Sequence, residues 1–516
     1  MRKSRPALVA CLLLLTARAA SADPVVIVVM DGLRPDSVVE ADMPNLTALA
    51  KGGTFFINHH PVYVSSTEVN GTALATGMRP GRSGVVGNVE YRPEVDPLFP
   101  VAMEDEWAAW TGDRASRWIS VQTLPQILRA QGLRTAVTGT KAVAMLWDRD
   151  WANRTVESPT LYGGSTIPGA FKDRLVAALG PIPPVTDRRY FVNGRQDRWT
   201  TEALTKVIWA GGELPALSVL WLSEPDYSQH GTGPGSPQSR LALKSSDDNL
   251  GLLLAALDAG GRRARTNLMV VSDHGFSTIA QSVDVLTDVS KQGFPVGGGF
   301  LEKPENGSIV GVPLGGLVTF YVLGRDRAVA ERLVRHLQTT NYAGVIFTRE
   351  KFTGTFSLTD AGLDGPTAPD VVMSMRWAAD APRPGGLPGL LLSSSTGYNP
   401  GQGMHGSLSR FDMSNTLIAS GPGFRSGLRS EVPSANSDVA PTVLRLLGLT
   451  PPAGMDGRVL EEALAGSTAA PRVETETLQA NASAGGRTWQ QYLKVSRVGT
   501  QTYYLEGNAG APPAGR

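Results

Sequence analysis

The stretch Val25-Val26-Ile27-Val28-Val29-Met30-Asp31-Gly32 determines the fold class of this chain. Its first six residues are apolar and mostly β-branched, which is typical of a strand buried on both faces of a parallel sheet. Similar buried strands are predicted at 135–140, 217–222 and 267–272. A parallel sheet buried on both faces has to be covered by helices on each side.

Helical patterns lie between these predicted strands. Amphipathic stretches occur at 43–51, 124–131 and 247–257. Alternation of strands and helices over this length predicts an α/β fold, a three-layer α/β/α sandwich with a doubly wound, mostly parallel central sheet. Ligands of such sheets bind beyond the carboxyl ends of the strands.

The 516 residues are expected to fall into five parts. A βαβ-like pattern in a polar, glycine-rich stretch indicates a smaller inserted α+β subdomain, and an Ala/Ser/Thr/Glu-rich stretch over 466–482 indicates a loose linker. The predicted parts are a signal peptide (1–22), the first part of the core (23–298), the inserted subdomain (299–379), a return to the core (380–465), and a linker with a C-terminal hairpin (466–516).

The N-terminus has the features of a targeting segment. Three basic side chains within residues 1–5 precede an apolar run over 7–17, and Ala20-Ser21-Ala22 supplies a small-residue cleavage pattern. The run is too short to span a bilayer comfortably. These features predict an exported protein, periplasmic or secreted, without a stable membrane anchor. Lipidation at Cys11 and an uncleaved anchor are the alternatives.

Composition narrows the functional classes. Lys plus Arg number 48 and Asp plus Glu 47, so the net charge is +1 and no basic run is present. This balance argues against a nucleic acid polymer as a partner. The one cysteine, Cys11, lies in the predicted leader, so the mature chain cannot form an internal disulfide. The sequence does not indicate an oligomeric state.

Residue types that bind metals gather where predicted strands end. A single aspartate after a strand is usually a helix cap and a single histidine is usually packed or exposed, but three of the six histidines fall in these segments. Carboxylate oxygen and imidazole nitrogen together suit Zn²⁺. The residues concerned are Asp31, Asp226, His230, Asp273, His274 and His405.

A hydroxyl nucleophile is predicted in the stretch that starts with Ser65-Ser66-Thr67, which reads as a loop opening a short helix that ends near Gly77. A threonine there is ordinarily an N-cap, but a helix N-terminus also attracts anions through its free N–H groups. A metal ion on the same hydroxyl would lower its pKa and make it competent to attack phosphorus.

The ordered series of motifs resembles the alkaline phosphatase superfamily, and most closely its type I phosphodiesterase/nucleotide pyrophosphatase branch. The likeness extends from about Val25 to about Leu464. Its motifs are Asp31-Gly32, Met43-Pro44-Asn45-Leu46, Thr67, Gly84-Val85-Val86-Gly87-Asn88, Glu224-Pro225-Asp226 with His230, Asp273-His274-Gly275, His405-Gly406 and Met455-Asp456-Gly457-Arg458.

This resemblance implies a site with two Zn²⁺ ions per chain. Asp226, His230 and His405 would hold the first ion. The second would be held by Asp31, Asp273 and His274 and reached by the nucleophile Thr67. Asn88 would donate its amide N–H to a phosphoryl oxygen, as a catalytic and substrate-binding residue. The reaction implied is in-line displacement through a phospho-threonine intermediate.

Lys141 leaves the substrate class open. Relatives that cleave phosphate monoesters or phosphonoacetate carry a lysine here and a second cation two residues later, whereas this chain has Val143 at that second position. One cation fewer suits a diester, which carries one negative charge fewer. The expected substrate is therefore a small phosphodiester or a nucleotide with a pyrophosphate bond. A phosphomonoesterase or phosphonate hydrolase that binds substrate through Lys141 is the alternative.

Three further functions are less favoured by the sequence. A sulfatase needs a Cys or Ser in a C/S-x-P-x-R pattern, and none lies near Thr67. A cofactor-independent phosphoglycerate mutase would use a serine and work in the cytosol. An inactive scaffold that only binds phosphorylated ligands would have no reason to keep all six metal-type side chains.

Overall fold

The computed structural model describes residues 22–104, 118–148, 154–380, 386–484 and 487–510. Residues 1–21 of the predicted signal peptide lie outside these ranges. Within them, no helix combines the length and the apolar character needed to cross a bilayer.

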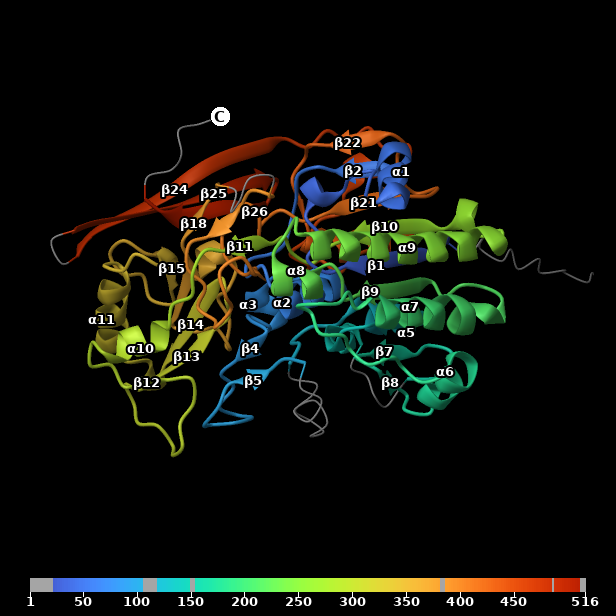
Figure 1. The fold of residues 1–516 in the computed structure, drawn as a ribbon. Helices are drawn as coiled ribbons and strands as arrows, with labels where there is room; N and C mark the ends of the chain where they lie inside the picture. The colour runs from blue at the N-terminus through green and yellow to red at the C-terminus, as the bar shows by residue number, and fades with distance from the viewer. Residues whose placement is uncertain (1–21, 105–117, 149–153, 381–385, 485–486, 511–516) are drawn as a thin grey trace, which may run out of the picture.

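A nine-stranded sheet forms the centre of the larger part of the molecule (Figure 1). Strands β10, β1, β9, β6 and β7 are parallel neighbours, while β21 and β8 run antiparallel to the strands beside them. In sheet order the strands are β22 (Leu428–Ser430), β2 (Thr54–Phe56), β21 (Leu417–Ser420), β10 (Asn267–Val271), β1 (Val25–Met30), β9 (Leu217–Leu222), β6 (Thr135–Gly139), β7 (Thr160–Tyr162) and β8 (Ser165–Ile167).

Side chains of β1 alternate between two apolar layers. Val25, Ile27 and Val29 pack in one cluster with residues of α2, α5 and α12. Val26, Val28 and Met30 pack in another with residues of α1 and α9. The sheet is thus covered on both faces, which confirms the predicted α/β sandwich. These helices are α2 (Thr67–Thr76), α5 (Leu124–Ala130), α12 (Val439–Leu446), α1 (Pro44–Gly52) and α9 (Pro237–Ala259).

Helix α9 is longer than the predicted 247–257. It begins at Pro237, after Ser236 accepts a hydrogen bond from the Ser239 N–H at 3.0 Å. A serine cap followed by proline is a strong start signal. The remaining α-helices of the described residues are α3 (Pro80–Ser83), α6 (Phe171–Leu179), α7 (Gly194–Glu202), α8 (Asp226–Thr232), α10 (Val285–Ser290) and α11 (Arg327–Leu337).

A second, six-stranded sheet lies to the left of the first in Figure 1, with α10 and α11 beside it. Strand β17 lies between β14 and β15 and is antiparallel to both, so α11 connects two parallel strands across it. The strands, in order, are β12 (Val296–Gly297), β13 (Ile309–Pro313), β14 (Leu317–Val322), β17 (Val371–Met375), β15 (Ala343–Thr348) and β16 (Phe356–Ser357).

Smaller sheets join these parts. A four-stranded sheet has the order β18 (Trp377–Ala378), β19 (Leu390–Leu391), β11 (Ser277–Ile279) and β20 (Gly403–Met404). Two two-stranded sheets pair β23 (Ser434–Ala435) with β3 (His59–His60), and β4 (Val89–Glu90) with β5 (Val101–Ala102).

The C-terminal residues form a three-stranded antiparallel sheet of β24 (Val473–Ala484), β25 (Arg487–Val498) and β26 (Gln501–Ala509). The prediction of a loose linker over 466–482 is therefore wrong from Val473 onward, where β24 begins. Strand β24 is mostly exposed and is held by twelve-residue pairing with β25. Its sequence carries only a weak burial signal, because Leu478, Ala480 and Ala482 pack against the apolar clusters while most of its other residues are polar and exposed.

Candidate metal centre and nucleophile

The carboxyl ends of three central strands place most of the candidate ligands. Asp31 follows β1 directly, Asp273 and His274 lie just beyond β10, and Asp226 begins α8 a few residues after β9. His405 follows β20, which pairs with β11. All of these side chains are buried. The neighbouring strands β10, β1 and β9 thus bring together Asp31 and the ligands that follow β9 and β10, while β20, in a separate sheet, adds His405.

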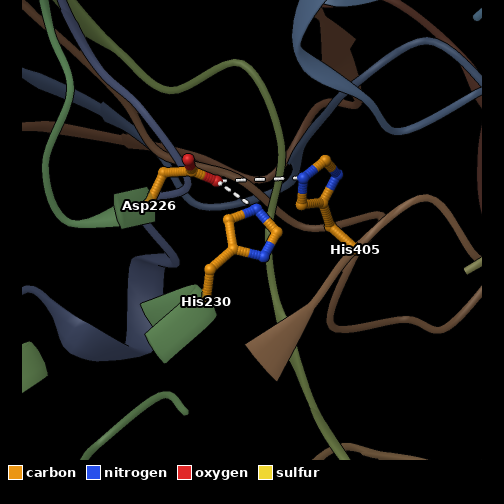
Figure 2. Close-up of side chains that lie close together, drawn as sticks. All are labelled: Asp226, His230 and His405. Carbon is orange, nitrogen blue, oxygen red and sulfur yellow. Dashed lines mark ion pairs between the residues drawn. The ribbon is translucent and has the colours of Figure 1, made fainter. Parts of the chain in front are cut away.

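Asp226, His230 and His405 form a first cluster (Figure 2). The Asp226 Oδ1 lies 3.2 Å from His230 Nε2 and 3.8 Å from His405 Nε2. Asp226 and His230 are four residues apart on α8, so one helix turn presents both side chains on the same face. Their ligand atoms all lie within 4.8 Å of one another, as the binding of one ion requires.

A second cluster lies around His274. Asp31 Oδ1 is 3.7 Å and Asp273 Oδ2 3.2 Å from His274 Nε2. The Thr67 hydroxyl lies 3.1 Å from the same nitrogen. Around His274, the ligand atoms of Asp31, Asp226 and His274 lie within 4.8 Å of one another. Asp226 therefore belongs to both clusters.

The three histidines share one tautomer. Each Nδ1 faces a backbone carbonyl: that of Gly403 for His230 at 3.1 Å, Gly275 for His274 at 3.0 Å and Ser65 for His405 at 2.9 Å. A carbonyl only accepts, so each Nδ1 donates the proton and each Nε2 keeps a lone pair directed at the clusters. Burial lowers the pKa of His274 and His405, which keeps both rings neutral, as metal ligation requires.

One oxygen of each aspartate is left without a hydrogen-bond partner among the described residues. These atoms are Asp31 Oδ1, Asp226 Oδ1 and Asp273 Oδ2, and all are buried. The other oxygens are held, for example by Trp221 Nε1–H on Asp31 at 2.8 Å and the Gly32 N–H on Asp273 at 3.0 Å. Free buried carboxylate oxygens opposite imidazole lone pairs fit divalent metal ions.

Lys141 lies between the two clusters. Its Nζ is 2.9 Å from Asp31 Oδ2 and 2.9 Å from Asp226 Oδ2. The ammonium therefore contacts the Oδ2 atom of each aspartate and leaves the Oδ1 atom free. Burial raises the pKa of Asp226, but the Lys141 ammonium outweighs it and holds that pKa well below its usual value. For Asp31, burial and then Asp273 raise the pKa well above the usual value despite Lys141.

Thr67 is the first residue of α2, where helix N–H groups and the dipole favour an anion. Asn88 lies beside it, because its Oδ1 accepts a hydrogen bond from the Glu68 N–H at 3.3 Å. No described residue accepts a hydrogen bond from Asn88 Nδ2. Hydroxyl, helix N-terminus and a free amide donor therefore meet next to the second cluster.

Two neighbours of the site were not assigned from sequence. Trp221 donates a hydrogen bond to Asp31, and its only sequence signal is an indole in a strand that is aliphatic apart from Ser218. Glu68 is buried with its Oε2 unpartnered among the described residues, and burial raises its pKa. His59 and His60, which form β3, are buried against Met413, Ser434 and Asn436 and do not enter either cluster.

The sandwich and the two clusters at its carboxyl edge define a protein of the alkaline phosphatase superfamily. Within it the chain belongs to the family of type I phosphodiesterases / nucleotide pyrophosphatases, whose sequence model matches residues 25–407. The resemblance expected from the motifs is thereby confirmed, as is an enzyme of this class at the level of the family.

Curated relatives are about a quarter identical to the chain over the aligned residues. Human ectonucleotide pyrophosphatase/phosphodiesterase family member 1 is 24% identical over 45% of the chain and 21% of its own length. Venom phosphodiesterase of Naja atra is 24% identical over 51% and 28%. Human family member 7 is 24% identical over 89% of the chain and 85% of its own length. The chain thus spans under a third of the first two relatives.

Proposed function

We propose that the chain is an exported hydrolase that uses two Zn²⁺ ions to cleave small phosphodiesters or nucleotide pyrophosphate bonds through a phosphorylated Thr67. The observation that carries this proposal is the set of free buried carboxylate oxygens and imidazole lone pairs around the Thr67 hydroxyl. Family membership supports the reaction class.

The first ion is assigned to Asp226, His230 and His405, and the second to Asp31, Asp273 and His274 with Thr67. Asp226 lies close enough to serve both sets. Bound zinc would supply Lewis-acid stabilisation of the oxygens around phosphorus and lower the pKa of the Thr67 hydroxyl.

Thr67 acts as the nucleophile. After losing its proton to solvent, Oγ1 attacks phosphorus in line with the leaving oxygen, whose bond to phosphorus breaks as the bond to Thr67 forms. Asn88 Nδ2 donates to a non-bridging oxygen, and the N-terminus of α2 favours the negative charge there. Water then attacks phosphorus, which breaks the phospho-threonine bond and restores the hydroxyl.

The position of Lys141 favours a diester over a monoester. A monoesterase or phosphonate hydrolase would need the ammonium on the substrate, but here its Nζ is held between two carboxylates. Three carboxylates and one ammonium leave the ligand set at about −2, which two divalent ions would change to about +2. This charge already suits the phosphoryl group without a further cation.

Paired initial rates test the proposal. Zinc-loaded residues 23–516 are assayed on bis-p-nitrophenyl phosphate, the p-nitrophenyl ester of thymidine 5′-monophosphate, and p-nitrophenyl phosphate. We expect both diesters to be cleaved faster than the monoester. A monoester preference would transfer the assignment to the phosphatase alternative, and no turnover with two zinc ions bound would overturn the hydrolase function. Processing after Ala22 in an expressing cell tests export.

A further inference from the structure

A network of buried amides lies beneath the site and has no part in the chemistry described above. Its centre is Asn436, in the 3₁₀ turn after β23, with none of its surface exposed. The other members are Asn70 on α2, Asn415 before β21, and His59 on β3, all of them buried.

Asn436 uses all four of its side-chain hydrogen-bonding positions. Its Nδ2 donates to the Asn70 Oδ1 at 3.0 Å and to the backbone carbonyl of Asp273 at 2.7 Å. Its Oδ1 faces His59 Nε2 at 2.9 Å and accepts from Asn415 Nδ2 at 3.1 Å. A fully satisfied buried amide has one orientation and resists movement.

Asn70 carries the link to the nucleophile. Its Oδ1 accepts from the Val62 N–H at 2.8 Å, and its Nδ2 donates to the carbonyls of Val64 at 3.0 Å and Ser66 at 3.1 Å. Backbone partners therefore fix the direction of this amide too. The segment it holds ends at Ser66, immediately before Thr67.

The same segment reaches both clusters. The Ser65 carbonyl accepts the Nδ1 proton of His405, which orients a ligand of the first cluster. The Asp273 carbonyl held by Asn436 belongs to a ligand of the second cluster. Asn436 thus connects the backbone of one metal ligand to the loop that positions another ligand and the nucleophile.

We infer that Asn436 is a positioning residue that sets the distance between Thr67 and the metal ligands, acting through Asn70 and the Asp273 carbonyl. It touches neither substrate nor metal. An aspartate could not replace it, because a second oxygen would face the Asp273 carbonyl and Asn70 Oδ1, which are both acceptors. The inference rests on the proposed function, which assigns the roles of Thr67 and the ligands.

Asn436→Ala and the isosteric Asn436→Asp test it, with Asn267→Ala as the matched control. Asn267 is also buried, but it lies at the opposite end of β10 and its Oδ1 accepts from the Gly423 N–H at 2.7 Å. We expect both Asn436 variants to lose about 100-fold in kcat on bis-p-nitrophenyl phosphate with KM nearly unchanged, since misplacement by about 1 Å costs that much. Asn267→Ala should stay within about threefold, although it too lowers Tm.

Two further readouts separate positioning from general destabilisation. Zinc affinity, measured by chelator competition at a temperature where every variant is folded, should fall about 10-fold in Asn436→Ala and not in Asn267→Ala. In a double-mutant cycle, Asn70→Ala with Asn436→Ala should lower kcat by less than the product of the single effects, because both belong to one unit. If Asn436→Ala does not fold, Asn70→Ala and Asn436→Ser give the same comparison.

The outcomes are distinct. If the native enzyme is active and the Asn436 variants lose no more kcat than Asn267→Ala, this inference alone is overturned. Fully multiplicative effects of Asn70→Ala and Asn436→Ala on kcat overturn it as well. A native chain that shows no turnover with two zinc ions bound, or that binds no zinc, overturns the proposed function and this inference with it.

Discussion

Thr67 gives the proposed reaction one oxygen atom, 3.1 Å from a histidine that itself belongs to the ligand set. Thr67→Ala removes that oxygen and no metal-binding carboxylate or imidazole. We therefore expect kcat to fall by roughly 10⁴-fold or more while zinc content, measured by atomic absorption, stays at two ions per chain.

Two variants of the same helix control this prediction. Thr67→Ser keeps the hydroxyl and should retain turnover. Thr72→Ala removes another buried threonine hydroxyl of α2, one with no described partner, and should leave kcat nearly unchanged. Turnover by Thr67→Ala comparable to that of Thr72→Ala would remove Thr67 as the nucleophile.

Lys141 neutralises carboxylates that zinc would also neutralise. In Lys141→Met the Oδ2 atoms of Asp31 and Asp226 lose their ammonium partner, and breaking a buried ion pair typically costs about 3 kcal/mol or more. We expect the free energy of unfolding to fall by this order in the zinc-free protein and by less with zinc bound, as measured by urea unfolding.

Lys51→Met is the control for this variant. Its ammonium pairs with Glu40 at 2.7 Å on the exposed surface, so its removal should leave stability nearly unchanged in both states. Equal losses for Lys141→Met with and without zinc would show that the ammonium and the ions do not share the same carboxylates.

At the scale of elements, the buried apolar strands were the most predictable part. Strand β1 has the predicted bounds, and β6, β9 and β10 begin at the predicted residues. A run such as 25–30 is apolar on both faces only where a sheet is covered twice. The pair β3–β23 was not predictable, because each strand has two residues and they meet only through the folded chain.

The burial of His59 on β3 makes the stability of the folded chain depend on pH. Burial lowers its pKa to about 3, with the neighbouring His60 also lowering it. The unfolded chain takes up a proton near pH 6.5 while the folded chain does not, so stability is complete above that pH and falls as the pH drops toward the folded pKa.

We expect His59 alone to account for about 2 kcal/mol of lost stability between pH 7 and pH 5. Urea unfolding of zinc-free protein at both pH values measures the loss without metal release. In His59→Gln the drop between the two pH values should be smaller by this amount. The same drop in native protein and variant would show that the ring is protonated in the folded chain.

On the scale of the whole molecule, the candidate site was predictable as a set of residues but not as a geometry. The sequence placed Asp31, Asp226 and Asp273 after strands, and parallel neighbours in one sheet bring such ends together. It gave no sign that Asp226 reaches both clusters or that Lys141 bridges two aspartates, because these depend on rotamers of side chains from separate segments.

The shared position of Asp226 leads to a prediction about metal binding and global stability. His230 contributes to the first cluster alone, so His230→Ala should keep one zinc ion, whereas Asp226→Asn should lose affinity at both sites and retain less than one. Asp247→Asn changes an equally buried aspartate that binds backbone N–H groups of α1, and it should keep two.

The free energy of unfolding gained on zinc binding should follow the same order as zinc content, because the ligands between residues 31 and 405 connect distant parts of the chain through the ions. A site at free zinc about a thousandfold above its Kd adds about 4 kcal/mol to the free energy of unfolding. Titrating zinc during urea unfolding should therefore stabilise native protein and Asp247→Asn most, His230→Ala less, and Asp226→Asn least. If Asp226→Asn gains as much as His230→Ala, Asp226 serves a single ion, and Asp31, Asp273 and His274 hold the second ion without it.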